Sequence, residues 1–128
     1  MSEIYDAFRN AARTGDLTAA AGYLADDVQL FASLTSKPFE GKEAVLPIFK
    51  MLIDVFEDLQ YLSVYDNPTV KVIVTTGTVN GRKVDGIQVL TLRADGLVSE
   101  FRDFVRPYSG AVALREAAEQ YLTGSTGS

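Results

Sequence analysis

An aspartate stands in the middle of the stretch SEFRDFVRP, residues 99–107, which otherwise has the composition of a strand. Successive side chains of a strand point to opposite faces, so Asp103 shares a face with Phe101 and Val105, the face that a core would cover. An ionised carboxylate in an apolar enclosure costs several kcal/mol unless it is paired, so it either raises its pKa or finds donors. Asp103 is therefore a candidate general acid or base near neutral pH.

Two short turns predict which side chain stands beside this carboxylate. Asn80-Gly81 and Asp95-Gly96 separate runs rich in β-branched and aromatic residues, as two-residue hairpin loops do. Such a loop fixes the register of its hairpin, so we expect Ile73 opposite Gln88, and Gln88 opposite Asp103. Gln88 can then orient the carboxyl group or polarise a substrate oxygen. The alternative is a purely structural pair, in which Gln88 and a tyrosine satisfy a buried Asp103.

The opposite face of these strands carries arginines and a glutamate, so we expect the helices to cover the Asp103 face. On the outer face Asp85 falls across from Arg106, which predicts a surface ion pair rather than a catalytic carboxylate. Apolar residues on that face, Ile87, Val89 and Phe104, suit a homodimer formed through the outer sheet surface.

Apolar side chains on the covered face are expected to form a pocket for a small hydrophobic ligand. The predicted ligand-binding residues are Phe8, Phe31, Phe49, Ile73, Leu90, Phe101 and Val105. Tyr5, Tyr23 and Tyr61 are further candidates for a phenolic donor, although each such residue is more often part of the core or rim. A second pocket carboxylate is not evident from the pattern.

The spacing of apolar residues along the sequence predicts the helices and strands that position these side chains. Apolar side chains recur at helical spacing in residues 4–14, in residues 17–24 after a cap at Asp16, in residues 42–59, and after Ser109. Strands are expected at residues 28–32, 61–65, 69–79, 82–93 and 97–106. Helices followed by an antiparallel meander predict one α+β domain over residues 1–122, with helices on one face of a curved sheet. Residues 123–128, TGSTGS, are typical of a flexible tail.

Composition excludes several classes of function. A chain of 128 residues with 47% hydrophobic content can form one core, and it has neither Cys nor His, so acid–base chemistry falls to Asp, Glu, Tyr or Lys. The net charge of −5 argues against a nucleic-acid binder. No apolar run approaches the roughly 20 residues that span a bilayer, and the start lacks a secretory pattern. We expect a cytoplasmic protein that binds no membrane, metal or cofactor.

Several stretches resemble the nuclear transport factor 2-like superfamily, and within it the SnoaL-like polyketide cyclase branch. They are ADDVQLF, the loop ending in FEGKEA, the segment NGRKVDGIQVLTLRADGLVSEFRDF and the closing amphipathic helix. The resemblance implies a cone-shaped α+β barrel whose curved sheet wraps a long helix around a hydrophobic pocket. FRDF is similar to the WRDYF-like stretch of limonene epoxide hydrolases and cyclases, which implies an acid or base at Asp103.

Two activities of the superfamily lack their residues in this alignment. The oxyanion-binding Asp and Tyr of ketosteroid isomerase align with Gln88 and Phe8, and its general base aligns near Ala32. The Arg-Val-Asp of limonene epoxide hydrolase aligns near Lys71-Val72-Ile73, so its second carboxylate is missing. The resemblance thus implies neither of these two active sites intact.

Two hypotheses of function follow. The favoured one is a cofactor-independent enzyme of the isomerase, cyclase or dehydratase type, acting through Asp103 and Gln88 on a small hydrophobic or polyketide-like molecule. The alternative is a ligand-binding or dimerising module with the same fold and no chemistry.

Overall fold

The computed structural model describes residues 3–124. The helices are α1 Glu3–Thr14, α2 Thr18–Ala21, α3 Lys42–Val55 and α4 Tyr108–Thr123. The strands are β1 Leu24–Phe31, β2 Phe39–Glu40, β3 Gln60–Asp66, β4 Val70–Val79, β5 Arg82–Leu92 and β6 Val98–Arg106. The α+β class agrees with the sequence prediction, and so does the order of elements apart from β2, which lies in a segment that was predicted to be a loop.

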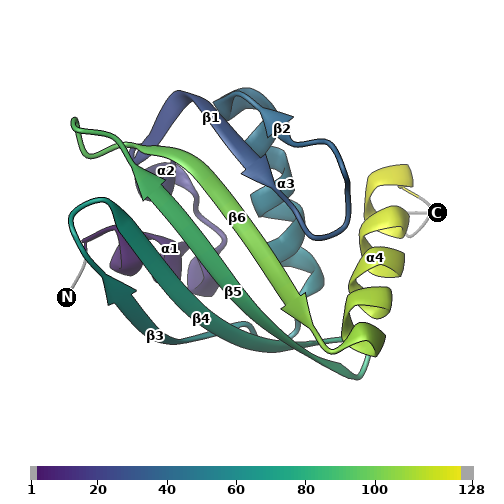
Figure 1. The fold of residues 1–128 in the computed structure, drawn as a ribbon. Coiled ribbons are helices and arrows are strands. Elements are labelled where there is room, and N and C mark those ends of the chain that lie inside the picture. The colour runs from purple at the N-terminus through teal and green to yellow at the C-terminus, as the bar shows by residue number, and fades with distance from the viewer. Residues whose placement is uncertain (1–2, 125–128) are drawn as a thin grey trace.

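The strands form one six-stranded sheet in the order β2-β1-β6-β5-β4-β3 (Figure 1). Strands β3 to β6 are the predicted antiparallel meander, but β1 pairs with β6 in parallel, so the sheet is mixed rather than wholly antiparallel. The parallel pair arises because the chain leaves β1, crosses through α3 and returns through the meander to the neighbouring position.

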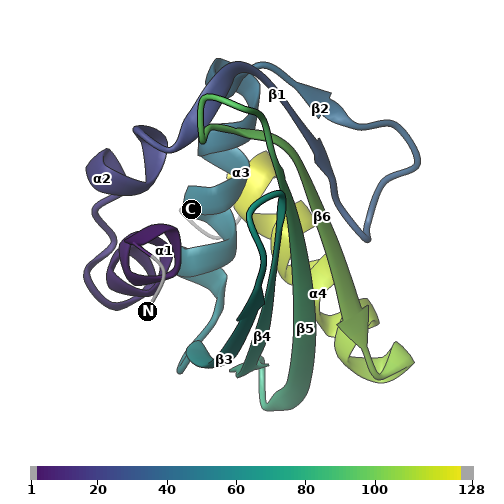
Figure 2. The same ribbon diagram turned by 60° about the vertical axis from the view of Figure 1, so that its left-hand side comes forward.

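The helices cover one face of the curved sheet, and this face carries Asp103, as predicted. Figure 2 shows α1 and α3 on the same side of the sheet. The rings of Phe8, Phe49 and Phe101 meet in the core between them, with centroids 4.7 Å apart for Phe49 and Phe101 and 5.8 Å apart for Phe8 and Phe49. The aromatic contacts join α1 and α3 to β6.

The second predicted helix is wrong in its extent. Asp16 does accept a hydrogen bond from the backbone N–H of Thr18, at 3.0 Å, but α2 has only one turn and β1 already begins at Leu24. Leu24 pairs with Val98 of β6, and both side chains are fully buried. Pairing with β6 and burial in the core therefore outweigh the helical spacing of the apolar residues.

The predicted strand register is confirmed around Asp103. Asn80 and Gly81 adopt φ of 49° and 80°, and the two-residue turn they form places Val79 opposite Arg82. Ile73 pairs with Gln88, and Gln88 with Asp103.

The second turn differs from the prediction although the register it predicted holds. The backbone N–H of Arg93 bonds to the carbonyl oxygen of Leu97 at 2.9 Å, so the loop has three residues rather than two. A register shift between Thr91 and Leu92 compensates, because Leu92 pairs with Val98 whereas Thr91 pairs with Glu100. This bulge restores the pairing that a two-residue loop would have given.

Helix α4 begins against β5 at a point of close backbone approach. A Cβ atom at Gly110 would lie 2.5 Å from the backbone oxygen of Lys83, so only glycine fits there without movement. The helix continues through Thr123, the first residue of the predicted tail, and residues 125–128 of that tail lie outside the described residues. Within residues 3–124, no helix is long and apolar enough to cross a bilayer.

Candidate functional site

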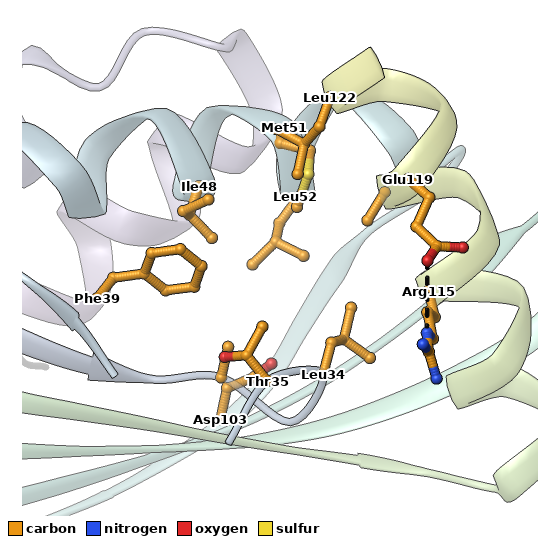
Figure 3. Close-up of a pocket in the computed structure, with 12 residues that line it drawn as sticks. Leu34, Thr35, Phe39, Ile48, Met51, Leu52, Asp103, Arg115, Glu119 and Leu122 are labelled. Carbon is orange, nitrogen blue, oxygen red and sulfur yellow. Dashed lines mark ion pairs between the residues drawn. The ribbon is translucent and has the colours of Figure 1, made fainter. Parts of the chain in front are cut away.

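A pocket of about 280 Å³ opens between α3, α4, β6 and the loop that follows β1 (Figure 3). Its wall is mainly apolar and comprises Ala32, Leu34, Phe39, Ile48, Met51, Leu52, Ala118 and Leu122. Four polar residues complete the lining: Thr35, Asp103, Arg115 and Glu119. We call this space the main pocket.

Asp103 is the half-buried carboxylate of the main pocket, and the sheet fixes its position. Its backbone pairs with Gln88 on one side, and on the other the hydroxyl of Ser33 donates to its carbonyl oxygen. Among residues 3–124 the carboxylate forms no ion pair. Burial raises the pKa of Asp103 from 3.8 to about 6, because the apolar wall disfavours the charged form.

Gln88 stands beside Asp103 in the sheet but faces a different space. It lines a hollow of about 30 Å³ in the core, and Leu52 borders both this small hollow and the main pocket. The Oε1 atom of Gln88 is buried without a hydrogen-bond partner within the described part of the chain. The structure therefore brings Gln88 and Asp103 into one row without placing both on one pocket wall.

Tyr61, from β3, is the tyrosine whose side chain reaches Gln88, although its backbone pairs with Thr75 in the neighbouring row of the sheet. Burial and the charge of Asp103 raise the pKa of the Tyr61 phenol, and a hydrogen bond with Gln88 acts in the opposite direction. The hydroxyl of Tyr5 donates to the backbone oxygen of Tyr61 at 3.3 Å. The hydroxyl of Tyr23 instead donates to Glu3, at 3.3 Å, on the surface. Of the three candidate tyrosines, Tyr61 is therefore the one whose hydroxyl group lies beside Gln88.

The predicted ligand-binding residues do not line the main pocket. Phe8, Phe49 and Phe101 border the small hollow. Ile73 and Leu90 are completely buried in the core, where they fill space between the sheet and the helices.

The other two predicted ligand-binding residues also lie elsewhere. Val105 packs against the apolar cluster beneath α4. Phe31 lies beneath Arg102, whose guanidinium carbon is 4.0 Å from the ring centroid. Since Arg102 belongs to the outer face of β6, the prediction placed Phe31 on the wrong side of the sheet.

Sequence reasoning missed two charged residues of the main pocket, Arg115 and Glu119 on α4. They form an ion pair with 3.6 Å between Nε and Oε2, and their side chains are 67% and 63% exposed, at the mouth of the pocket (Figure 3). Glu119 supplies the second carboxylate that the sequence pattern did not reveal. The sequence did contain a signal for this ion pair. Arg115 and Glu119 are four residues apart on α4, and Ala118 and Leu122 beside them form an apolar stripe on the same helix.

Other carboxylates lie outside the main pocket. Asp85 forms the predicted ion pair with Arg106, at 3.0 Å, and accepts a hydrogen bond from the hydroxyl of Thr76. These bonds lower the pKa of Asp85. Across residues 3–124 no three acidic side chains converge as metal ligands would.

Comparison with known protein families identifies the fold. A family model described as a SnoaL-like domain matches residues 5–101. The chain belongs to the SnoaL-like family. Its fold is the nuclear transport factor 2-like, or cystatin-like, arrangement of a curved sheet and helices.

Two solved structures illustrate the relationship of this SnoaL-like protein to others. An uncharacterised bacterial protein with a cystatin-like fold from Silicibacter pomeroyi has 22% identity and a TM-score of 0.88, with 96% of this chain and 87% of that chain covered. A steroid delta-isomerase from Pseudomonas aeruginosa has 24% identity and a TM-score of 0.86, with 100% and 98% covered. At this level of identity the likeness shows the fold alone. No curated protein sequence matches the chain.

Proposed function

We propose that this SnoaL-like protein is a cofactor-independent acid–base enzyme that acts on a small hydrophobic molecule in the main pocket. The observation that supports this most is a half-buried Asp103 at the wall of an apolar pocket, with no cationic partner among the described residues and a pKa of about 6. A carboxylate with such a pKa is mostly ionised at neutral pH and is a stronger base than an ordinary aspartate.

The proposed chemistry is a proton transfer at carbon. The Asp103 carboxylate removes a proton from a carbon next to a carbonyl group, and the electron pair moves to the carbonyl oxygen to give an enolate. Where a carbon–carbon double bond lies next to the deprotonated carbon, the carboxylic acid thus formed returns the proton to the far carbon of that double bond, which shifts the double bond and completes an isomerisation. An enolate that attacks a second carbonyl group instead gives an aldol-type ring closure.

Residues around Asp103 have supporting roles in this proposal. Arg115 at the pocket mouth can stabilise negative charge on a substrate oxygen, and its ion pair with Glu119 holds it there. Gln88 is a positioning residue, because it lies opposite Asp103 and its unpartnered Oε1 can accept a hydrogen bond from the protonated carboxyl group.

The test compares the wild-type protein with Asp103→Asn over a panel of enones, epoxides and polyketide mimics. We expect turnover of at least one substrate class by the wild type and loss of that turnover in the variant. Apolar ligands should still raise the melting temperature of the variant, because its pocket is unchanged. Equal turnover by the two proteins would refute a catalytic role for Asp103.

The competing proposal is a ligand-binding module without catalysis. It is favoured by the separation of Gln88 from the main pocket, which leaves no amide beside the carboxylate on the pocket wall. If apolar ligands raise the melting temperature of the wild type while no panel member is converted, this second proposal replaces the first.

We also propose that the outer sheet face forms a homodimer. This face exposes large apolar side chains, with Tyr65 at 64%, Phe104 at 55% and Ile87 at 44%. Two ion pairs on this face form within the chain, between Arg106 and Asp85 at 3.0 Å and between Arg102 and Glu100 at 3.3 Å. A second copy can therefore cover the apolar residues without meeting a surface of like charge.

A further inference from the structure

A second hollow of about 270 Å³ lies between α1 and the start of β3. It is lined by Arg9, Arg13, Leu59, Gln60 and Tyr61 and shares no lining residue with the main pocket. We call it the arginine hollow. Its polar lining thus comes from two arginines, a glutamine and a tyrosine, whereas the charged residues of the main pocket are Asp103 and the Arg115–Glu119 ion pair.

The two arginines of the hollow have no partner within residues 3–124. Most basic side chains of the chain lie within 4.0 Å of a carboxylate, but neither Arg9 nor Arg13 takes part in an ion pair, a hydrogen bond or a ring contact there. The chain has 17 acidic residues against 12 basic ones, so partners are plentiful. Even Asp6, one turn before Arg9 on α1, does not pair with it.

Placing these two exposed arginines one turn apart on α1 carries a small electrostatic cost. Like charges four residues apart on a helix repel each other and destabilise the helix slightly. Arg13 lies in the last turn of α1, where the helix dipole favours a cation, but Arg9 lies a turn earlier and gains little from it. An anion held between the two guanidinium groups would remove the repulsion.

We propose that the arginine hollow binds the oxyanion of a small molecule, and that a phosphate monoester is preferred to a carboxylate. Guanidinium groups form paired hydrogen bonds with phosphate and carboxylate oxygens. Two arginines match the charge of nearly −2 that a phosphate monoester carries at neutral pH. The amide of Gln60 is a further donor, and Leu59 with the ring of Tyr61 provides an apolar wall for an aromatic or aliphatic substituent.

The arginine hollow is independent of the proton-transfer chemistry proposed for Asp103. Its one link to the interior is through Leu59 and Tyr61, which also border the small hollow that contains Gln88. Failure of one proposal therefore does not imply failure of the other. Asp103→Asn should abolish turnover yet leave anion binding at the arginine hollow unchanged.

Calorimetric titration of the full chain with phenyl phosphate in about 0.1 M salt tests the proposal. Arg9→Gln and Arg13→Gln should each weaken binding by about tenfold or more, because each removes charged hydrogen bonds to the ligand. Arg82→Gln is the matched control: Arg82 is an exposed arginine at the β4–β5 turn, without an ion pair among the described residues and outside the hollow. It should change affinity by less than about twofold, since salt screens distant charges. Circular dichroism confirms that each variant is folded.

Two further ligands define the chemistry of the hollow. Benzoate should bind more weakly than phenyl phosphate, and inorganic phosphate should compete with both. Absence of saturable phenyl phosphate binding by the folded wild type would overturn the proposal. So would equal weakening by Arg82→Gln, because it would show attraction to overall charge rather than a site.

Discussion

Replacing Asp103 by Asn is expected to stabilise the protein near pH 8 and to leave its stability almost unchanged near pH 3. Burial raises the pKa of Asp103 from 3.8 to about 6 in the folded chain, whereas the unfolded chain keeps the ordinary value. Between these values the unfolded chain binds fewer protons than the folded chain. The free energy of unfolding of the wild type therefore falls as pH rises from about 4 to about 6.

The size of the effect follows from the same pKa. Each pKa unit corresponds to about 1.4 kcal/mol, so a rise from 3.8 to about 6 amounts to about 3 kcal/mol once Asp103 is ionised. Solvent reaches part of this half-buried side chain, so about 3 kcal/mol is an upper value. For a domain of this size it corresponds to a rise in melting temperature on the order of 10 °C. Asparagine has a similar shape and no charge, so it avoids this cost at every pH.

Urea denaturation across this pH range measures the effect directly. The matched control is Asp58→Asn, since Asp58 is exposed and has no ion pair within residues 3–124. The difference in unfolding free energy between wild type and Asp103→Asn should grow from near zero at low pH to a plateau above about pH 6. If the unfolding free energies of the wild type and Asp103→Asn differed by the same amount at every pH, the apolar wall would not disfavour the charge of Asp103.

Three more predictions concern the surroundings of the site. Gly110→Ala should lower the free energy of unfolding by about 1–3 kcal/mol in urea titrations, because the added Cβ would lie 2.5 Å from a backbone oxygen of β5. The neighbouring substitution Ser109→Ala is the control and should have little effect. Leu122→Glu should weaken binding of an apolar ligand by about tenfold in a thermal-shift titration, because it puts a charge on the wall of the main pocket. The control is Gln120→Glu, which adds the same charge on the same helix outside that wall and should leave binding unchanged. Phe104→Glu should convert the proposed homodimer to a monomer in sedimentation experiments; a wild-type protein that is already monomeric would contradict the dimer.

The sequence was sufficient to predict which residues share a row of the sheet. Strand register depends on the alternation of side chains and on turn residues, and both are local, so together they are enough to identify the neighbours of Asp103. The burial of Asp103 is predictable too, because the charged residues of β6 other than this one all lie on the opposite face.

The wall of the main pocket could not be derived in the same way. It is assembled from α3, α4 and the loop after β1, and the position of that loop and the depth of the space beside α4 depend on tertiary packing. Ile73 and Leu90, which were predicted to bind ligand, fill the core instead. Hydrophobic periodicity identifies the side chains that face the interior, but it does not show which of them border a cavity. The extent of β1 was missed because its pairing with β6 is distant in sequence.

The hairpin between β5 and β6 has a consequence for how relatives of this protein can diverge. Its loop contains one residue more than a tight reversal needs, and the bulge between β5 and β6 absorbs that residue before the strands reach Gln88 and Asp103. A deletion in the tip that also removes the bulge would leave both side chains in place. A change of one residue in the length of this tip, coupled to the gain or loss of the bulge, therefore leaves Gln88 opposite Asp103.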